Sequence, residues 1–265
     1  MKLLSFVVLA TSLAAADSQS APFKDPHLEE GIRKFILGAE PGKPLTPAQL
    51  EHVLLVNASG VRDLSGLENC PNLGTVFLTE SDVSDLSPLG KLTKLQQLTV
   101  NGGKVRDLTP LSGLSSLEYL DLTGNAISDL KPLAGLKSLR TLRLSNNQIQ
   151  DLAPLQGLNG LRVLHLDGNQ ISDLRPLGSL SAVWLLSLKN NRIVDLAPLA
   201  SVTGWSYLYL DQNQIADLAP LVSALERGKS VTSMWTISLH GNPLSADAKT
   251  KQLPELKKLA FDVIE

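Results

Sequence analysis

Residues 117–136 read LEYLDLTGNAISDLKPLAGL, and the same frame returns along most of the chain. Its clearest mark is the dipeptide Asp-Leu, which recurs eight times at a constant spacing of 22 residues. The aspartates of this series are Asp63, Asp85, Asp107, Asp129, Asp151, Asp173, Asp195 and Asp217. A period of about 20 to 29 residues held this strictly is typical of a solenoid, in which each unit packs only on its neighbours.

The first part of each unit predicts a strand. Apolar and polar residues alternate, as in Leu120, Asp121 and Leu122, which is the period of a strand with one buried side. One unit cannot bury its apolar face alone, so we expect the strands to stack in parallel, one per repeat. Three residues after the strand stands an asparagine, whose amide can satisfy buried backbone groups. We expect an asparagine ladder formed by Asn125, Asn147, Asn169, Asn191, Asn213 and Asn242.

The second part of each unit, Asp-Leu-x-Pro-Leu, predicts the return of the chain. The aspartate can accept a hydrogen bond from a nearby backbone N–H, while proline fixes φ and removes a donor. A tight turn or a single 3₁₀ coil should therefore form the convex side. Ser59, Ser81 and Gly103 stand where asparagine is expected, so we predict looser hydrogen bonding in the early repeats.

This combined frame resembles the leucine-rich repeat, and its 22-residue length is similar to that of internalin-type bacterial proteins. The resemblance implies an α/β solenoid, a horseshoe or right-handed superhelix with a parallel β-sheet on its concave side. It further implies tight turns or 3₁₀ coils on the convex side and helical caps at both ends. Members of such a family share a scaffold and differ in what their exposed positions bind.

Four segments are predicted. They are a signal peptide at 1–16, an N-terminal helical cap at 17–50, about nine repeats over 51–242 and a C-terminal cap at 243–265. Leu28, Ile32, Phe35 and Ile36 share one helical face in the first cap, and Thr46 before Pro47 is typical of a helix N-cap.

A seven-residue insertion near 222–233 interrupts the period, because the step from Asn213 to Asn242 is 29 residues rather than 22. Val222 and Leu225, followed by charged residues, indicate a helix in place of the tight turn. Elsewhere we expect equivalent residues of neighbouring repeats to stand 22 positions apart, including those of the first strand.

The N-terminus predicts export. Met1 and Lys2 open an apolar run over residues 3–15 that ends in small residues, as in a secretory signal peptide. The run is shorter than the roughly 20 residues that span a membrane, so we expect no stable membrane insertion. No lipid-accepting cysteine follows the signal and no sorting motif precedes the C-terminus, unlike cell-wall-anchored internalins. We therefore expect a secreted or periplasmic monomer.

Composition and motifs argue against catalysis and nucleic-acid binding. A net charge of −2 offers no basic stripe for nucleic acid. The single cysteine, Cys70, aligns with core leucines and is interpreted as a buried, inert thiol. His165 and His240 project from strands about 14 Å apart, too far to share a zinc ion. We predict no catalytic residues, no metal and no cofactor.

The variable positions of the strands should point outward and stack into columns on the concave face. Trp205, by contrast, falls at a core leucine position. Aromatic residues and arginine dominate binding hot spots because they bury large areas at low entropic cost. The candidate partner-binding residues are Tyr119, Arg140, Arg143, Arg162, His165, Trp184, Leu185, Tyr207, Tyr209 and Trp235.

Three alternatives compete with the favoured hypothesis, a non-catalytic scaffold that grips a protein partner. The aromatic residues could only stabilise the sheet, by about 0.2 to 1 kcal/mol per cross-strand pair. The arginines could form a self-neutralising network with Asp121 and Asp167, which would contribute little to stability. Tryptophan and tyrosine could instead stack on sugar rings and make the protein a glycan or cell-wall binding module.

Overall fold

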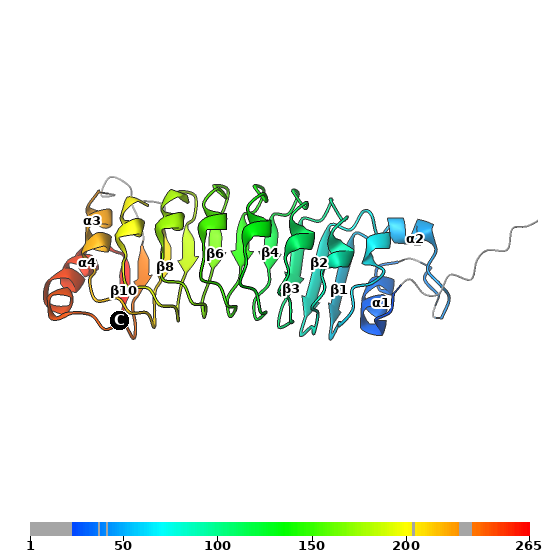
Figure 1. Cartoon of the computed structure of the whole chain (residues 1–265), viewed down its shortest axis with the longest axis horizontal. Helices are drawn as coiled ribbons and strands as arrows, with labels where there is room; N and C mark the ends of the chain where they lie inside the picture. Colours follow the sequence, from blue (N-terminus) through cyan, green and yellow to red (C-terminus); the bar gives the residue numbers. More distant parts are fainter. Residues whose placement is uncertain (1–22, 37, 41, 203–204, 228–234) are drawn as a thin grey trace, which may run out of the picture.

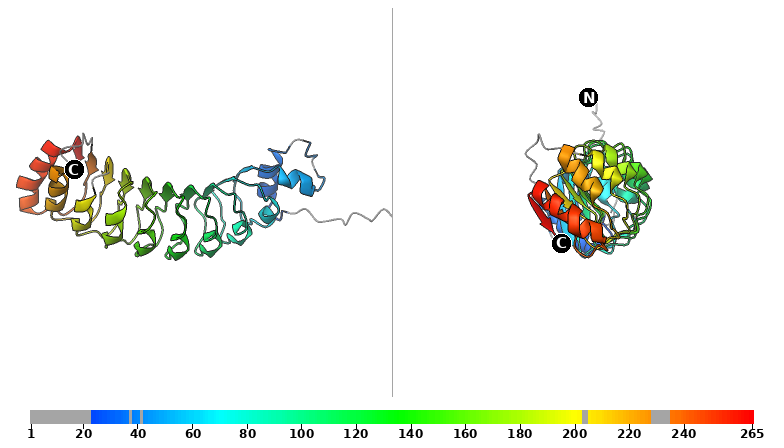
Figure 2. Two further views of the ribbon diagram at one scale, coloured as in Figure 1. Left: turned by 90° about the horizontal axis from the view of Figure 1, so that it is seen from above. Right: turned by 90° about the vertical axis from the view of Figure 1, so that its left-hand side faces the viewer.

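The computed structural model describes residues 23–36, 38–40, 42–202, 205–227 and 235–265. Within these residues ten strands form one parallel sheet in sequence order (Figure 1). The sheet lines the concave side of a solenoid that curves along its length (Figure 2). The strands are β1 (Leu55–Ser59), β2 (Thr75–Thr79), β3 (Gln97–Val100), β4 (Tyr119–Asp121), β5 (Thr141–Arg143), β6 (Val163–His165), β7 (Leu185–Ser187), β8 (Tyr207–Tyr209), β9 (Thr236–Ser238) and β10 (Asp262–Ile264).

The Asp-Leu series makes the turns, as predicted. Oδ1 of each of the eight aspartates accepts a hydrogen bond from the backbone N–H two residues later, for example from Ser87 to Asp85 at 2.8 Å. Short 3₁₀ turns follow the first seven aspartates. They are η1 (Leu67–Asn69), η2 (Ser87–Leu89), η3 (Thr109–Leu111), η4 (Lys131–Leu133), η5 (Ala153–Leu155), η6 (Arg175–Ser179) and η7 (Ala197–Ser201).

The asparagine ladder is also confirmed. Asn147 Nδ2 donates to the carbonyls of Leu122 and Leu144, each at 3.0 Å, so one side chain bridges two repeats. Its Oδ1 accepts from the N–H of Ile127 at 3.0 Å. Asn125, Asn169, Asn191, Asn213 and Asn242 repeat this pattern.

The early repeats lack these bridges, as expected. The Ser81 hydroxyl donates only within its own repeat, to the Thr79 carbonyl at 3.3 Å. Gly103 has no side chain that could form such a bridge, and the surrounding structure leaves no space for one. A Cβ there would lie 2.7 Å from the Val83 carbonyl oxygen. The neighbouring backbone thus occupies the space where an asparagine side chain would begin.

Two helices, α1 (Pro26–Arg33) and α2 (Pro47–Glu51), stand at the N-terminal end of the sheet. Asp25 links α1 to the first repeat. Its Oδ1 accepts from the N–H groups of His27 and Leu28 at the helix start, and its Oδ2 accepts from Arg62 N at 2.7 Å. Burial raises the pKa of Asp25, but these backbone hydrogen bonds outweigh burial and leave its pKa lowered.

The structure tests two predictions for the N-terminal cap. Thr46 is the N-cap of α2, as predicted from Thr-Pro, and it also forms a reciprocal capping box with Gln49. Leu28 and Ile32 are fully buried, whereas Phe35 is 46% exposed, so its predicted place on the buried face is wrong. The reason is that α1 ends at Arg33 and Phe35 no longer follows the helical period.

The register of the first strand also differs from the prediction. Leu55 pairs with Thr75, an offset of 20 residues rather than 22, and Val53 is buried instead of lying on the concave face. The shift is even, so the alternation of inward and outward side chains survives it. The turn between Ala58 and Val61 is two residues shorter than the equivalent turn of the next repeat.

The C-terminal end begins with the predicted helix, α3 (Ala219–Arg227), which replaces the tight turn after Asp217. Strand β9 then pairs with β8 at the expected offset of 29, Tyr207 opposite Thr236. A π-helical turn, η8 (Ala248–Gln252), continues into α4 (Leu253–Leu259), where Pro254 sits in the first turn. Strand β10 was not predicted, and it adds in parallel to β9.

The core runs the length of the solenoid as stacked leucine side chains. Cys70 is fully buried among them, as predicted, and burial raises the pKa of its thiol to about 12. The predicted signal segment, residues 1–16, and residues 228–233 of the predicted insertion lie outside the described residues.

Candidate functional site

One column of the concave face is built by consecutive backbone hydrogen bonds. Arg140 N donates to Glu118 O at 2.8 Å, Arg162 N to Arg140 O at 2.8 Å, and Trp184 N to Arg162 O at 2.9 Å. The series ends with Ser206 N donating to Trp184 O at 2.7 Å. Because neighbouring strands lie about 4.8 Å apart, these side chains stand side by side on successive repeats.

Three of the predicted aromatic residues form an exposed cluster. The rings of Trp184 and Tyr207 meet edge to face, with centroids 6.0 Å apart. Tyr209 follows two residues later on the same face of β8, and its ring stacks on Tyr207 at 6.4 Å. Trp184 is 40% exposed and Tyr207 39% exposed, while Leu185 beside them is half-buried. We call Trp184, Tyr207 and Tyr209 the aromatic cluster.

The arginine group, Arg140, Arg143 and Arg162, lies on the N-terminal side of this cluster, and all three side chains are exposed. Within the described part of the chain, none of the three takes part in a salt bridge. Arg143 places its guanidinium carbon 5.9 Å from the centre of the Tyr119 ring, a cation–π contact.

The neighbouring carboxylates are committed elsewhere. Asp121 is only 6% exposed, and its Oδ1 accepts from the N–H and the hydroxyl of Thr123 at 3.1 and 2.7 Å. Asp167 Oδ1 accepts from Ser187 Oγ at 2.5 Å and from the backbone N–H of Lys189 at 2.8 Å. Within the described residues no salt bridge joins the arginines to these aspartates. Arg143, Asp121 and Asp167 nevertheless all act on the pKa of His165, so the self-neutralising network stays an alternative hypothesis.

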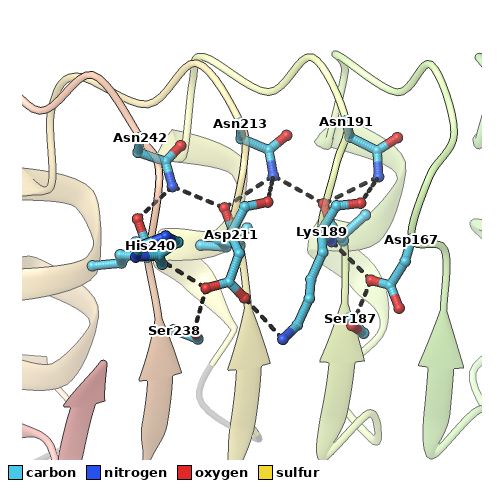
Figure 3. A network of polar contacts seen from close by, with 12 residues as sticks. Asp167, Ser187, Lys189, Asn191, Asp211, Asn213, Ser238, His240 and Asn242 are labelled. Atoms are coloured by element: carbon cyan, nitrogen blue, oxygen red, sulfur yellow. Dashed lines mark hydrogen bonds and ion pairs between the residues drawn. The ribbon is translucent and has the colours of Figure 1, made fainter. Parts of the chain in front are cut away.

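A polar network centred on Asp211, which Figure 3 shows, was not predicted from the sequence. Asp211 Oδ1 accepts from the Ser238 hydroxyl and from the N–H of His240, and Asp211 Oδ2 pairs with Lys189 Nζ at 3.0 Å. The same ammonium nitrogen lies 4.7 Å from the centre of the Tyr209 ring. Burial raises the pKa of Asp211, yet the hydrogen bonds from Ser238 and Lys189 leave it lowered.

One signal could have revealed this network. Asp167 and Asp211 occupy the same repeat position two units apart, and in each case the following strand ends in serine, Ser187 or Ser238. Each aspartate thus joins one repeat to the next, and the second holds Lys189 against the aromatic cluster.

His165 lies between Arg143 and Ser187 in the strand register and is half-buried. Burial lowers the pKa of His165, and the positive charge of Arg143 lowers it further against the opposing effect of Asp167. The imidazole is therefore neutral at pH 7, because its ordinary pKa is already about 6.5.

One predicted member does not belong to the exposed surface. Trp235 is 2% exposed and packs in the core, so its expected place on the concave surface is wrong. Its carbonyl accepts from Phe261 and Asp262 at the start of β10, the strand that covers this end of the sheet. The register of β9 is the expected one, so the difference comes from the unpredicted strand β10, which pairs next to Trp235. Trp205 is buried, as predicted.

Two further features of the described residues bear on chemistry and placement. Within them, no three His, Cys, Asp or Glu side chains gather closely enough to hold a metal ion. The helices of the same residues are all too short or too polar to cross a bilayer.

Comparisons with known proteins agree with this geometry. A family model described as Leucine Rich repeats (2 copies) matches residues 115–157 and 137–181. The crystal structure of an internalin, inlF, from Listeria monocytogenes shares 30% identity at a TM-score of 0.81, covering 94% of this chain and 72% of that one. The chain belongs to the internalin-type leucine-rich repeat family.

A second Listeria monocytogenes structure, internalin C2, shares 33% identity with this internalin-type chain at a TM-score of 0.77 and covers 85% of it and 100% of its own length. The ectodomain of a plant receptor kinase from Arabidopsis thaliana, at 19% identity and a TM-score of 0.55, shares the fold alone; it covers 72% of this chain and 27% of its own. No curated protein matches the sequence significantly. The fold is that of a protein-interaction scaffold.

Proposed function

We propose that this internalin-type protein is an exported, non-catalytic scaffold that binds a protein partner through its concave face. The observation that carries the proposal is the aromatic cluster, with Trp184 40% exposed and Tyr207 39% exposed beside three arginines without ion pairs. Tryptophan, tyrosine and arginine are the residues enriched at the centres of protein interfaces. An exposed cluster of this composition is best explained by a partner that covers it.

Rigidity supports the proposal. The aromatic side chains stand on strands whose ends are tied by Asn191 and Asn213, and Lys189 is held against Tyr209 by Asp211. A surface fixed before binding loses less conformational entropy when the partner arrives. Support for export comes from the apolar run and small-residue exit of residues 1–16.

Stabilisation of the sheet is a weaker explanation for the aromatic cluster. A cross-strand aromatic pair contributes about 0.2 to 1 kcal/mol. Strand β3 fills equivalent positions with Gln97 and Thr99 and pairs with both of its neighbours. Exposed tryptophan is therefore not needed to hold such a strand in the ladder.

Absence of catalysis is part of the proposal. The hydroxyls of Ser187 and Ser238 donate to aspartate carboxylates, and neither accepts a hydrogen bond from a histidine ring in the described residues. A nucleophile, a base and an orienting group are thus not assembled on this face.

Glycan binding remains the second candidate because of one geometric feature. The rings of Tyr207 and Tyr209 are stacked within 22° of parallel, and the outer face of such a pair can stack on a sugar ring. Trp184 meets Tyr207 edge to face, at 69°, and does not enlarge that face. A site for sugar would therefore be small and would leave the arginine group unused.

The test is a capture experiment with the full chain as bait on envelope and extracellular fractions. We expect the wild type to retain a protein that a Trp184→Ala, Tyr207→Ala double variant does not, since hot-spot truncations cost about 2 kcal/mol or more. Phe35→Ala is the matched control, an exposed aromatic residue away from the sheet. Circular dichroism verifies the fold of each bait.

Three outcomes count against the proposal. Both baits could retain the same material, or neither could retain a protein, or binding could appear only on a glycan array. In the last case, Ala at Arg140 and Arg162 should leave sugar binding unchanged, whereas it should weaken a protein complex.

A further inference from the structure

We infer that the concave face recognises an acidic protein surface, one that presents clustered Asp or Glu carboxylates next to an aliphatic or aromatic side chain. This inference rests on the proposed function and adds the chemistry of the partner. It can fail while the proposed function stands, because a concave interface could also bind a neutral partner.

The first step is that the exposed basic groups of the site have no ion-pair partner within the described residues. Arg140, Arg143 and Arg162 are all exposed, and their contacts in the described residues include no carboxylate. Guanidinium groups at interfaces are usually paired, since planar, bidentate contacts to carboxylates are among the strongest polar interactions of proteins. Three such groups on one face, none paired with a carboxylate in the described residues, indicate that the binding partner supplies the anions.

The second step is that, among the described residues, three of the four carboxylates near this site are held inside the protein. Asp121 is 6% exposed and Asp211 8% exposed, and both accept hydrogen bonds from neighbouring groups. Asp167 is half-buried and bonded to Ser187, and Glu118 is the exposed exception. The whole chain carries a formal charge of −2, so the exposed arginines are a local feature and do not reflect a basic protein.

The third step is the fixed spacing of the basic groups. Arg140 and Arg162 occupy equivalent positions on adjoining repeats, joined by the 2.8 Å backbone hydrogen bond between them. The guanidinium of Arg140 lies directly against Gly160, where any Cβ would collide with it. That glycine leaves room for the side chain to reach across the next repeat, so two guanidinium forks can face one acidic segment.

The fourth step concerns the apolar part of the partner. Trp184 follows Arg162 directly in the same column and leads into the aromatic cluster. A partner that meets the arginines therefore also meets an apolar surface within one repeat. Glu118, exposed on the other side of Arg140, ends the positive stretch. A stretch this short suits a few carboxylates better than a long polyanion, which needs an extended basic groove.

The experiment is a selection of random dodecamer peptides displayed on yeast, with the full chain as the soluble target. Peptides that bind the wild type but not the Trp184→Ala, Tyr207→Ala double variant are the ones that use the concave face. Among these we expect Asp and Glu to be enriched beside Leu, Ile or Phe. Arg140→Gln, Arg162→Gln should weaken the selected peptides by at least about tenfold.

The matched control is Arg192→Gln, which removes another exposed arginine, located in the turn after Asn191 and away from the sheet. It should change binding by less than about twofold. Raising the salt from about 50 to 500 mM should weaken binding to the wild type more than to the double glutamine variant, because screening acts on the arginines.

The inference is overturned if face-dependent peptides carry no acidic enrichment, or if the glutamine variant binds them as well as the wild type does. It is also overturned if no peptide depends on the face. A heparin octasaccharide or a thymidine dodecamer that binds through the same arginines, without acidic peptides doing so, would assign the site to a polyanion. The capture experiment described under the proposed function accepts a partner of any charge. It therefore shows whether the concave face binds a protein at all, even when the acidic-partner inference fails.

Discussion

The two halves of the solenoid share one scaffold. They differ in the asparagine bridges between repeats and in the side chains on the concave face. Strands β2 and β3 present Thr75 and Gln97 with a half-buried Phe77 and a buried Thr99, and their repeats lack the ladder asparagine. Strands β7 and β8 carry the aromatic cluster, and each of their repeats is bridged to the one before it by an asparagine. The half with the exposed aromatic residues is thus also the half with the more complete asparagine ladder.

That coincidence has a physical meaning. Exposed aromatic side chains contribute little to stability, and a binding surface benefits from a backbone that does not rearrange. The N-terminal half manages with fewer polar bridges because Asp25 ties the cap to the first repeat and the leucine core is continuous. The predictions below test this contrast, from the largest expected effect to the smallest.

Removal of a ladder amide should have the largest effect. Asn169→Ala leaves the carbonyls of Leu144 and Leu166 and the N–H of Ile149 without their partner in a buried site. Since an unsatisfied buried group costs about 1 to 3 kcal/mol, we expect the free energy of unfolding to fall by about 3 kcal/mol or more. Ser81→Ala, the matched change in the N-terminal half, should cost less than about 1 kcal/mol. Urea denaturation monitored by circular dichroism measures both, and equal losses would contradict the contrast.

A consensus substitution should fail in the N-terminal half. Gly103→Asn restores the residue of the repeat frame, yet its Cβ would lie 2.7 Å from the Val83 carbonyl oxygen and 2.8 Å from Asn125 Oδ1. Overpacking of this kind typically costs about 1 to 3 kcal/mol, so we expect a lower thermal midpoint in calorimetry. Gly113→Asn, at a glycine with open space around its Cβ, serves as the control. A raised midpoint for Gly103→Asn would show that the absent ladder residue is the only difference between the halves.

The polar network should show a defined pH dependence. The lowered pKa of Asp211 means that its ionised form stabilises the fold above the unfolded value near 3.8, and this contribution is lost as the pH falls through the folded value. Asp211→Asn should therefore destabilise the protein at pH 7, and the gap to the wild type should shrink below about pH 4. Denaturation at pH 7 and pH 3 measures it. A gap that is constant or widens in acid would show that the charge of Asp211 is not what matters.

The smallest effect on stability is expected at the aromatic cluster itself. Trp184→Ala removes one edge-to-face contact and leaves no buried cavity, because the side chain is 40% exposed. The loss should stay below about 1 kcal/mol. Trp205→Ala, in the core at 2% exposure, should cost about 3 to 5 kcal/mol by the same assay. Similar losses at both positions would favour a structural role for Trp184.

Sequence reasoning succeeded where the period holds. The Asp-Leu turns and the asparagine ladder follow from residues repeated in the same local context, so one unit predicts the others. It failed where that context ends. The short first turn shifted β1 by two residues, and strand β10, which the repeat does not predict, lies next to Trp235, a predicted surface residue that is buried.

The candidate site was predictable in part for the same reason. The columns of the sheet identified Trp184, Tyr207 and the arginines, since backbone position alone puts them on one face. Side-chain pairing was not predictable, because it depends on rotamers that no spacing fixes. Asp121 and Asp167, which one alternative paired with the arginines, bond Thr123 and Ser187, and Lys189 pairs with Asp211 of the next repeat.

The most direct test of the central claim compares the two halves at matched positions. A partner obtained by capture is titrated against Trp184→Ala, Tyr207→Ala and against Gln96→Ala, Gln97→Ala, which changes the corresponding positions of β3. We expect the first pair to weaken the affinity at least about 30-fold and the second to change it less than about twofold. Equal effects of the two pairs, or a larger effect of the glutamine pair, would contradict a binding site in the C-terminal half of the concave face.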